Sequence, residues 1–303
     1  MRVAITGGTG FVGRHLVENL DPSDTVVISR RTGVELDDVD ALATAVQGCE
    51  VVAHCAGINR ELGDQTFNRV HVDGTRSVID AARRAGVKRI VMVSFLRARP
   101  DCGSAYHETK WAAEELIRAS GLEYAILKFG MIYGPGDHMV DHVAKAVRTL
   151  PVFGTVGYRE KRVRPVPVED AVKVLLAALE GRVPNQTVAV MGAEELELGE
   201  AVRRIAGVAD RHPLYVPLPV WTIRAIAQVT ECLMVTPLVA KAQARMLAEG
   251  VSEAAPPAPE LPAELRPRLP FSEARIRAAL PRGRFTSDDL RVKGWLRRHR
   301  SAA

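Results

Sequence analysis

The chain has 303 residues, of which 47% are hydrophobic, and a formal net charge of +5 at pH 7. This composition suits one large or two smaller globular domains, and no run of about 18 apolar residues predicts a membrane span. Its four cysteines form no C-x-x-C pair, and its first residues resemble a strand and a glycine turn rather than a signal peptide. We therefore expect a cytoplasmic protein with reduced thiols and no structural metal.

The charge is concentrated near the end of the sequence. Residues 264–303 hold eleven Lys/Arg and four Asp/Glu, and the basic side chains Arg291, Lys293, Arg297, Arg298 and Arg300 lie close together. Apart from Trp295, no aromatic residue interleaves this run, as a nucleic-acid platform would require. We interpret the run as a solvated helix face rather than a nucleic-acid or membrane contact.

Strand and helix patterns alternate through the first half of the chain. Short Val/Ile/Leu-rich runs predict strands at 2–6, 25–29, 50–54, 89–94 and 124–128, and amphipathic spacing predicts helices at 38–47, 73–85 and 105–120. Strands that are apolar on both faces are typical of parallel strands covered by helices. The order predicts an α/β fold, a doubly wound parallel sheet of the Rossmann kind with ligands at the carboxyl ends of its strands.

The second half has a looser pattern. It predicts helices at 140–150, 168–180, 197–206, 220–234, 272–280 and 287–299, and a strand at 186–191. Pro213, Pro217 and Pro219 interrupt the chain before the helix at 220, and six prolines make 255–270 an extended surface segment. We expect a dinucleotide-binding domain at 1–130, to which 166–190 returns. A smaller substrate lobe would comprise 131–165 and 191–303, including the proline-rich segment.

A glycine turn follows the first predicted strand. Gly7, Gly10 and Gly13 are spaced G-x-x-G-x-x-G between that strand and a helical stretch. A turn of this kind lets backbone amides at a helix N-terminus approach a pyrophosphate. We expect residues 7–13, including Thr9, Phe11 and Val12, to bind a dinucleotide.

The end of the second strand bears on the choice of coenzyme. An NAD site normally has an acidic residue there for the ribose 2′-hydroxyl, but this chain has Ser29, Arg30 and Arg31. Because guanidinium groups bind phosphate bidentately, we predict NADP(H) in preference to NAD(H). The alternative is that both arginines face solvent and stack on the adenine, which leaves NAD(H) open.

Tyr106 and Lys110 are four residues apart on a predicted helix and therefore share a face. A neighbouring ammonium group would lower the phenol pKa from about 10, so that Tyr106 could exchange protons with an alcohol or carbonyl near neutral pH. The alternative is an ordinary surface tyrosine with a solvated lysine.

The histidines show no metal-ligand spacing, and His138 and His142 are interpreted as a helix surface.

These motifs together resemble the short-chain dehydrogenase/reductase superfamily, in its extended or atypical branch. The resemblance rests on the glycine turn, His54-Cys55-Ala56-Gly57, Gly74-Thr75, Tyr106/Lys110, residues 127–137 and Val166-Pro167-Val168-Glu169-Asp170. Residues 216–219 and 242–247 also resemble bacterial relatives of the NAD(P)H-binding accessory subunit of respiratory complex I.

The resemblance implies roles for particular residues. Tyr106 would be the general acid/base, and Lys110 would lower its pKa and hold the nicotinamide ribose. Ala56 and Gly57 would line the adenine-ribose side, and the segment from Phe129 to Met131 would flank the nicotinamide. Family members often dimerise through the helix that carries the Tyr/Lys pair, so a homodimer is implied as one option.

The chain also departs from the family pattern. Ser94 matches the first residue of a Ser-Ser pair, but Phe95 stands where the catalytic serine is more usual, and Ser104 is a candidate substitute. Phe129 replaces a proline, and Glu35 stands where an aspartate near the adenine is usual. Three hypotheses follow: an oxidoreductase acting on a small molecule, a coenzyme-binding protein with little turnover, and a nucleotide-sugar epimerase or dehydratase.

A stripe on the predicted helix at 220–234 bears on the substrate. Val220, Ile223, Ile226 and Val229, with Trp221 alongside, are apolar at helical spacing. The stripe would suit an apolar substrate, but we prefer to interpret it as the core of the lobe.

Overall fold

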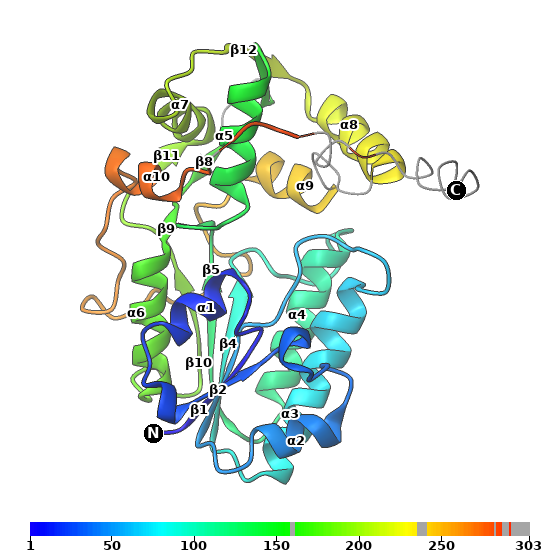
Figure 1. Cartoon of the computed structure of the whole chain (residues 1–303), viewed down its shortest axis with the longest axis vertical. Helices are drawn as coiled ribbons and strands as arrows, with labels where there is room; N and C mark the ends of the chain where they lie inside the picture. The colour runs from blue at the N-terminus through cyan, green and yellow to red at the C-terminus, as the bar shows by residue number, and fades with distance from the viewer. Residues whose placement is uncertain (158–160, 235–240, 282, 287–290, 292–303) are drawn as a thin grey trace, which may run out of the picture. The chain divides into compact units, whose positions relative to one another are not determined.

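The computed structural model describes residues 1–157, 161–234, 241–281, 283–286 and 291, and these divide into two compact units (Figure 1). The first unit comprises Met1–Ile132, Arg164–Glu194 and Ser252–Pro270. The second comprises the described residues of Tyr133–Val163, Glu195–Val251 and Phe271–Ala303.

A six-stranded parallel sheet forms the centre of the first unit. Its strands are β1 (Val3–Thr6), β2 (Thr25–Ile28), β3 (Val51–His54), β4 (Arg89–Phe95), β5 (Glu123–Phe129) and β10 (Gln186–Val190). They lie in the order β10-β5-β4-β3-β1-β2, and every neighbouring pair is parallel. The predicted doubly wound sheet is confirmed.

Helices cover both faces of this sheet (Figure 1). Helices α1 (Phe11–Val17) and α6 (Val168–Leu179) pack on one face, and α2 (Val39–Ala45), α3 (Gly74–Arg84) and α4 (Ala105–Arg118) on the other. The connections include short helical turns η1 (Pro22–Asp24) and η2 (Arg30–Thr32), the π-helical turn η3 (Asn68–Asp73), and the two-residue strands β6 (Ile132–Tyr133) and β9 (Val166–Pro167). Two apolar layers, one on each side, make the core.

The strand order creates a crevice at one position. β1 pairs with β2 on one side and with β3 on the other, so the chain leaves β1 and β3 in opposite directions along the sheet. In open α/β sheets, ligands bind outside the carboxyl ends of strands at such a switch point. The segments that begin at Gly7 and Cys55 follow these two strands and therefore flank the crevice.

The proline-rich segment belongs to the first unit and not to the second, contrary to the prediction. The amide of Ala189 in β10 donates to the carbonyl of Pro259 at 2.8 Å, and Leu261 is buried in the core beside the sheet. The amides of Arg268 and Leu269 both donate to the carboxylate of Asp170. Proline lacks an amide hydrogen but keeps its carbonyl, so this extended segment can pair with the edge strand β10.

The second unit is built from small sheets and helices. Its helices are α5 (Met139–Thr149), α7 (Leu198–Val208), α8 (Val220–Leu233), α9 (Lys241–Glu249) and α10 (Glu273–Ala279), and its strands are β7 (Val152–Val156), β8 (Arg162–Val163), β11 (Leu196–Glu197) and β12 (Leu214–Leu218). The sequence did not predict α9 or any of these four strands. β12 contains Pro217, which is tolerated because, among the described residues, β12 pairs with β7 alone. The predicted helix at 287–299 lies outside the described residues, as does the basic run except for Arg291.

Helix α8 is only partly lobe core, in contrast to our preferred interpretation. Ile223 and Ala227 pack in a small apolar cluster, whereas Trp221 and Val229 are 71% and 53% exposed. Within the described part of the chain, no helix combines the length and the apolar character that crossing a bilayer requires.

Candidate active site

The glycine turn after β1 is packed directly against the turn after β3. Gly7 has a φ of +68°, and a Cβ atom there would lie 2.7 Å from the backbone of Ala56. A Cβ at Gly13 would collide with the carbonyl oxygen of Gly7. Glycine is therefore required on both backbone and steric grounds, and the close approach leaves the start of α1 open to a ligand.

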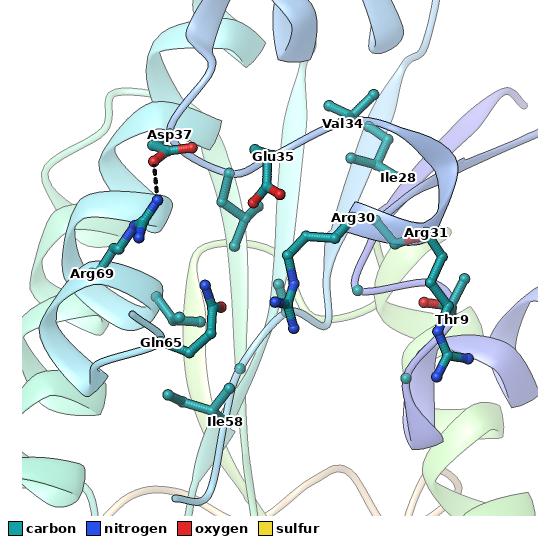
Figure 2. A pocket seen from close by; sticks show the side chains of 17 residues that line it. Thr9, Ile28, Arg30, Arg31, Val34, Glu35, Asp37, Ile58, Gln65 and Arg69 are labelled. Atoms are coloured by element: carbon teal, nitrogen blue, oxygen red, sulfur yellow. Dashed lines mark hydrogen bonds and ion pairs between the residues drawn. The ribbon is translucent and has the colours of Figure 1, made fainter. Parts of the chain in front are cut away.

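A pocket of about 530 Å³ lies where β1, β2 and β3 end (Figure 2). Eight residues predicted to bind coenzyme line it: Gly7, Thr9, Gly10, Ser29, Arg30, Arg31, Ala56 and Gly57. The other predicted residues, namely Phe11, Val12, Gly13, Ser94, Tyr106, Lys110, Phe129 and Met131, are not part of its lining. The structure therefore brings together the residues expected at the adenosine and pyrophosphate end.

The two arginines lie on the rim of this pocket. Both are exposed, and the side chain of Arg30 extends into the pocket while that of Arg31 turns toward Thr9 (Figure 2). Ser29 accepts a hydrogen bond from the amide of Thr32 and so caps η2. The cap fixes the turn that presents both guanidinium groups.

Two acidic residues also line the pocket, although the predicted site contained none at the end of β2. Glu35 and Asp37 reach it because the chain turns back after η2 (Figure 2). Arg69 donates to Asp37 at 2.7 Å, and this hydrogen bond lowers the pKa of Asp37. Asp37 is thus already engaged, while Glu35 faces the same space as Arg30.

The segment after β3 supplies a wall of the pocket that the sequence analysis missed. Ile58, Gln65, Arg69 and Val70 line the pocket in addition to Ala56 and Gly57. Ala56 and Gly57 follow directly after a strand, and this position could have indicated the further lining residues, since the chain that follows must pass along the same crevice.

Tyr106 lies in the first turn of α4 among aromatic rings. The ring centroids of Phe67, His71, Phe95 and His107 are 5.4–5.7 Å from that of Tyr106, all in edge-on arrangements. Burial among these rings raises the pKa of Tyr106. The expectation that Lys110 lowers this pKa is therefore wrong for the protein alone, because desolvation of the phenolate dominates.

Lys110 is buried one turn further along α4. Its ammonium donates to the carbonyl of Val93 at 3.2 Å, and a Cβ placed on Gly57 would lie 2.9 Å from its Nζ. The ammonium therefore lies against a residue of the pocket wall. Burial lowers the pKa of Lys110 to about 8, although the charges of Glu114 and Cys55 oppose this shift.

Ser94 does not face the pocket. Its hydroxyl donates to Oε1 of Glu114 at 2.5 Å, and this buried carboxylate also binds Lys128 and Arg118. Ser94 is two residues from Met92 in β4, so both side chains lie on the same face of the sheet, the face that α4 covers. We therefore do not retain Ser94 as a donor to a substrate oxygen. The alternative, Ser104, is buried and lies 2.7 Å from Nδ1 of His107.

The predicted nicotinamide contacts fall on two residues at the end of β5. The side chain of Phe129 is 1% exposed and packs in the core. Its carbonyl accepts from the amide of Leu96, and the carbonyl of Met131 accepts from Val166. Phe129 is therefore a core residue.

Among the residues described, no group of three His, Cys, Asp or Glu is arranged to hold a metal ion.

Comparisons with known proteins agree with this geometry. A family model described as NAD(P)H-binding matches residues 30–150. A ceramide reductase of Caulobacter vibrioides is 37% identical over 191 residues, which are 58% of this chain and 60% of that protein. The mitochondrial NADH dehydrogenase 1 alpha subcomplex subunit 9 of Mus musculus is 28% identical over 240 residues, covering 72% of this chain and 63% of that one.

A solved structure matches most of the chain. The UDP-glucose 4-epimerase of Thermus thermophilus in complex with NAD has a TM-score of 0.65 at 20% identity, and the match covers 92% of this chain and 97% of that one. At this identity the likeness concerns the fold. The first unit has the fold of an NAD(P)-binding Rossmann domain and is similar in sequence to NAD(P)H-binding proteins. The chain spans less than two thirds of the length of the reductase and of the mouse subunit.

Proposed function

We propose that the chain is an NAD(P)H-dependent oxidoreductase that reduces a carbonyl group. The observation that carries this proposal is the position of Lys110, whose ammonium lies against Gly57 of the coenzyme pocket one turn from Tyr106. A nicotinamide coenzyme, when bound, supplies a hydride to the substrate carbon. The glycine turn fits such a coenzyme because a Cβ at Gly7 or Gly13 would collide with the backbone of Ala56 or of Gly7, so the tight turn before α1 requires glycine at both positions.

Tyr106 supplies the proton in this proposal. The phenol is protonated at neutral pH and donates to the oxygen of a carbonyl as that oxygen gains charge. The products are an alcohol and an oxidised coenzyme. Lys110, one helical turn from Tyr106, holds the coenzyme ribose in this proposal.

We propose NADP(H) as the preferred coenzyme and a largely apolar compound as the substrate. Arg30 extends into the pocket, where it could bind a 2′-phosphate (Figure 2). The rings of Phe67 and Phe95 beside Tyr106 favour an apolar group near the reacting carbon. The similarity to a ceramide reductase supports a lipid carbonyl as the substrate class.

The test combines coenzyme titration with turnover. NADPH and NADH are titrated by fluorescence, and coenzyme oxidation is followed with aldehydes, ketones, quinones and long-chain keto-lipids. Tyr106→Phe should abolish turnover but retain coenzyme binding, whereas Tyr124→Phe, a control tyrosine on β5, should leave both unchanged. Full turnover by Tyr106→Phe, or no binding of either coenzyme, would contradict the proposal.

A coenzyme-binding protein with little turnover is the second candidate. It is favoured by the Phe95 ring, which lies 5.4 Å from that of Tyr106, and by the engagement of Ser94 with Glu114. In this case the wild type binds NADPH but reduces none of the carbonyl compounds.

A nucleotide-sugar epimerase or dehydratase is the third candidate, supported by the fold match to the Thermus thermophilus enzyme. NAD that remains bound through purification, together with conversion of UDP-sugars without net coenzyme oxidation, would favour it.

A further inference from the structure

Five buried or half-buried side chains link the glycine turn to the catalytic helix. Thr6 Oγ1 lies 2.7 Å from His54 Nδ1, and His54 Nε2 lies 2.9 Å from Thr75 Oγ1. Thr75 donates to the carbonyl of His71 at 2.5 Å, and His71 Nδ1 lies 3.0 Å from Thr109 Oγ1. The chain of hydrogen bonds thus runs from the end of β1 through β3, α3 and η3 to α4.

The hydroxyl protons fix the direction of every bond around His54. Thr75 has one hydroxyl proton and gives it to the carbonyl of His71. It must therefore accept at its oxygen from the Nε2–H of His54, and His54 Nδ1 accepts from Thr6. His54 is neutral in this arrangement, and burial, followed by the charge of Lys110, lowers its pKa to about 3.

The same argument fixes the tautomer of His71. Thr109 gives its proton to the carbonyl of Ala105 at 2.6 Å, so it accepts from the Nδ1–H of His71. Both backbone groups of Ile58 lie 3.1 Å from Nε2 of His71, and in this tautomer the Nε2 lone pair accepts the amide hydrogen. Burial, and next the charge of Lys110, lowers the pKa of His71 well below its ordinary value.

The two ends of His71 therefore reach the two halves of the proposed site. Ile58 lines the coenzyme pocket, and Thr109 lies on α4 between Tyr106 and Lys110. We propose that His71 is a positioning residue that holds the wall of the coenzyme pocket against the helix of the proton donor. This inference rests on the proposed function for the identity of the site, but the hydrogen bonds themselves do not depend on the substrate.

Two substitutions separate the ends of His71. The amide nitrogen of an asparagine can occupy the place of Nδ1, so His71→Asn keeps a donor for Thr109 and loses the bond to Ile58. The terminal amide of a glutamine reaches the place of Nε2, so His71→Gln keeps an acceptor for Ile58 and loses the bond to Thr109. Each leaves one buried polar group without its partner, an effect of about tenfold in the affected step.

The expected results differ for the two variants. His71→Asn should raise the Kd for NADPH about tenfold with kcat near the wild-type value, and His71→Gln should lower kcat about tenfold with Kd near wild type. If both variants change Kd and kcat alike, or change only the melting temperature, His71 is a structural residue and the proposal is wrong.

Substitutions at Thr109 provide the conservative rescue and cover the case in which the His71 variants do not fold. Thr109→Val removes the acceptor and should reproduce the loss of kcat seen in His71→Gln, while Thr109→Ser keeps the hydroxyl and should retain wild-type kcat. Equal losses in both variants would overturn the proposal.

Failure of the proposed function gives a different experimental result. If the wild type itself reduces no carbonyl compound, the proposed function is wrong, and the comparison of NADPH affinity between His71→Asn and His71→Gln still decides the role of His71.

Discussion

The ammonium of Lys110 and the α-carbon of Gly57 are so close that a Cβ at residue 57 would lie 2.9 Å from Nζ. Gly57→Ala should therefore displace the ammonium from the pocket wall and weaken coenzyme binding about tenfold, the effect of one misplaced charge-assisted hydrogen bond. The measurement is a fluorescence titration with NADPH. Gly207→Ala, which meets no atom within 4 Å, is the control and should bind as wild type. Unchanged binding by Gly57→Ala would show that Lys110 does not contact the coenzyme.

Coenzyme binding by the wild type should weaken as the pH rises through about 8, because Lys110 in the free protein loses its charge there. The neighbouring groups do not titrate in this range. The pKa of His54 is about 3 and that of Cys55 about 12, while burial raises the pKa of Tyr106. The Kd for NADH between pH 6.5 and 9.5 measures the effect without the 2′-phosphate. Lys110→Met should bind more weakly and show no such dependence.

The lowered pKa of Lys110 also determines how the stability of the protein changes with pH. The pKa of Lys110 is lower in the folded protein than its ordinary value of 10.5, so between about pH 8 and 10.5 the unfolded chain binds more protons at this residue. The contribution of Lys110 to the free energy of unfolding should therefore rise with pH in this window. Urea denaturation of the wild type and of Lys110→Met at several pH values isolates this contribution. An equal pH dependence in both proteins would contradict it.

Arg30→Ala should raise the Kd for NADPH about tenfold while leaving that for NADH nearly unchanged, because a guanidinium bound to the 2′-phosphate contributes to NADPH alone. Arg31→Ala tests the second arginine separately, and Arg211→Ala in the second unit serves as the control. If Arg30→Ala weakens both coenzymes equally, the side chain stacks on the adenine instead.

Ser94→Ala should lower the free energy of unfolding by about 1–3 kcal/mol, because Glu114 loses a hydrogen-bond donor in a fully buried cluster. Coenzyme affinity and kcat should stay near wild type. Urea denaturation and steady-state kinetics on the same preparation measure the two effects. A loss of kcat of about a hundredfold with unchanged stability would show instead that Ser94 acts in catalysis.

Much of the first unit could be predicted because its signals are local. The Val/Ile-rich strand at Val51–His54 and the glycines at 7, 10 and 13 determine a strand and a tight turn from neighbouring residues alone. The four-residue spacing of Tyr106 and Lys110 likewise gives one helix face.

The remainder depends on contacts between distant residues. Successive side chains of β4 point to opposite faces of the sheet, so the face that Ser94 occupies depends on how the strand is placed in the sheet. The sequence alone does not give that placement. The attachment of Pro259 to β10 and the bond of His71 to Thr109 join segments that are 70 and 38 residues apart. The pKa of Tyr106 was wrongly predicted because the rings of Phe67 and Phe95 come from two other parts of the chain.

The proline-rich segment along β10 determines how this sheet can meet other chains. An edge strand with open amides is a template for intermolecular pairing and aggregation, and proteins commonly protect such edges. Here Ala189 already donates to Pro259, and the prolines around it offer no amide to a further strand. The segment therefore protects the β10 edge of the sheet against pairing with a second molecule, which leaves β2 as the other edge strand.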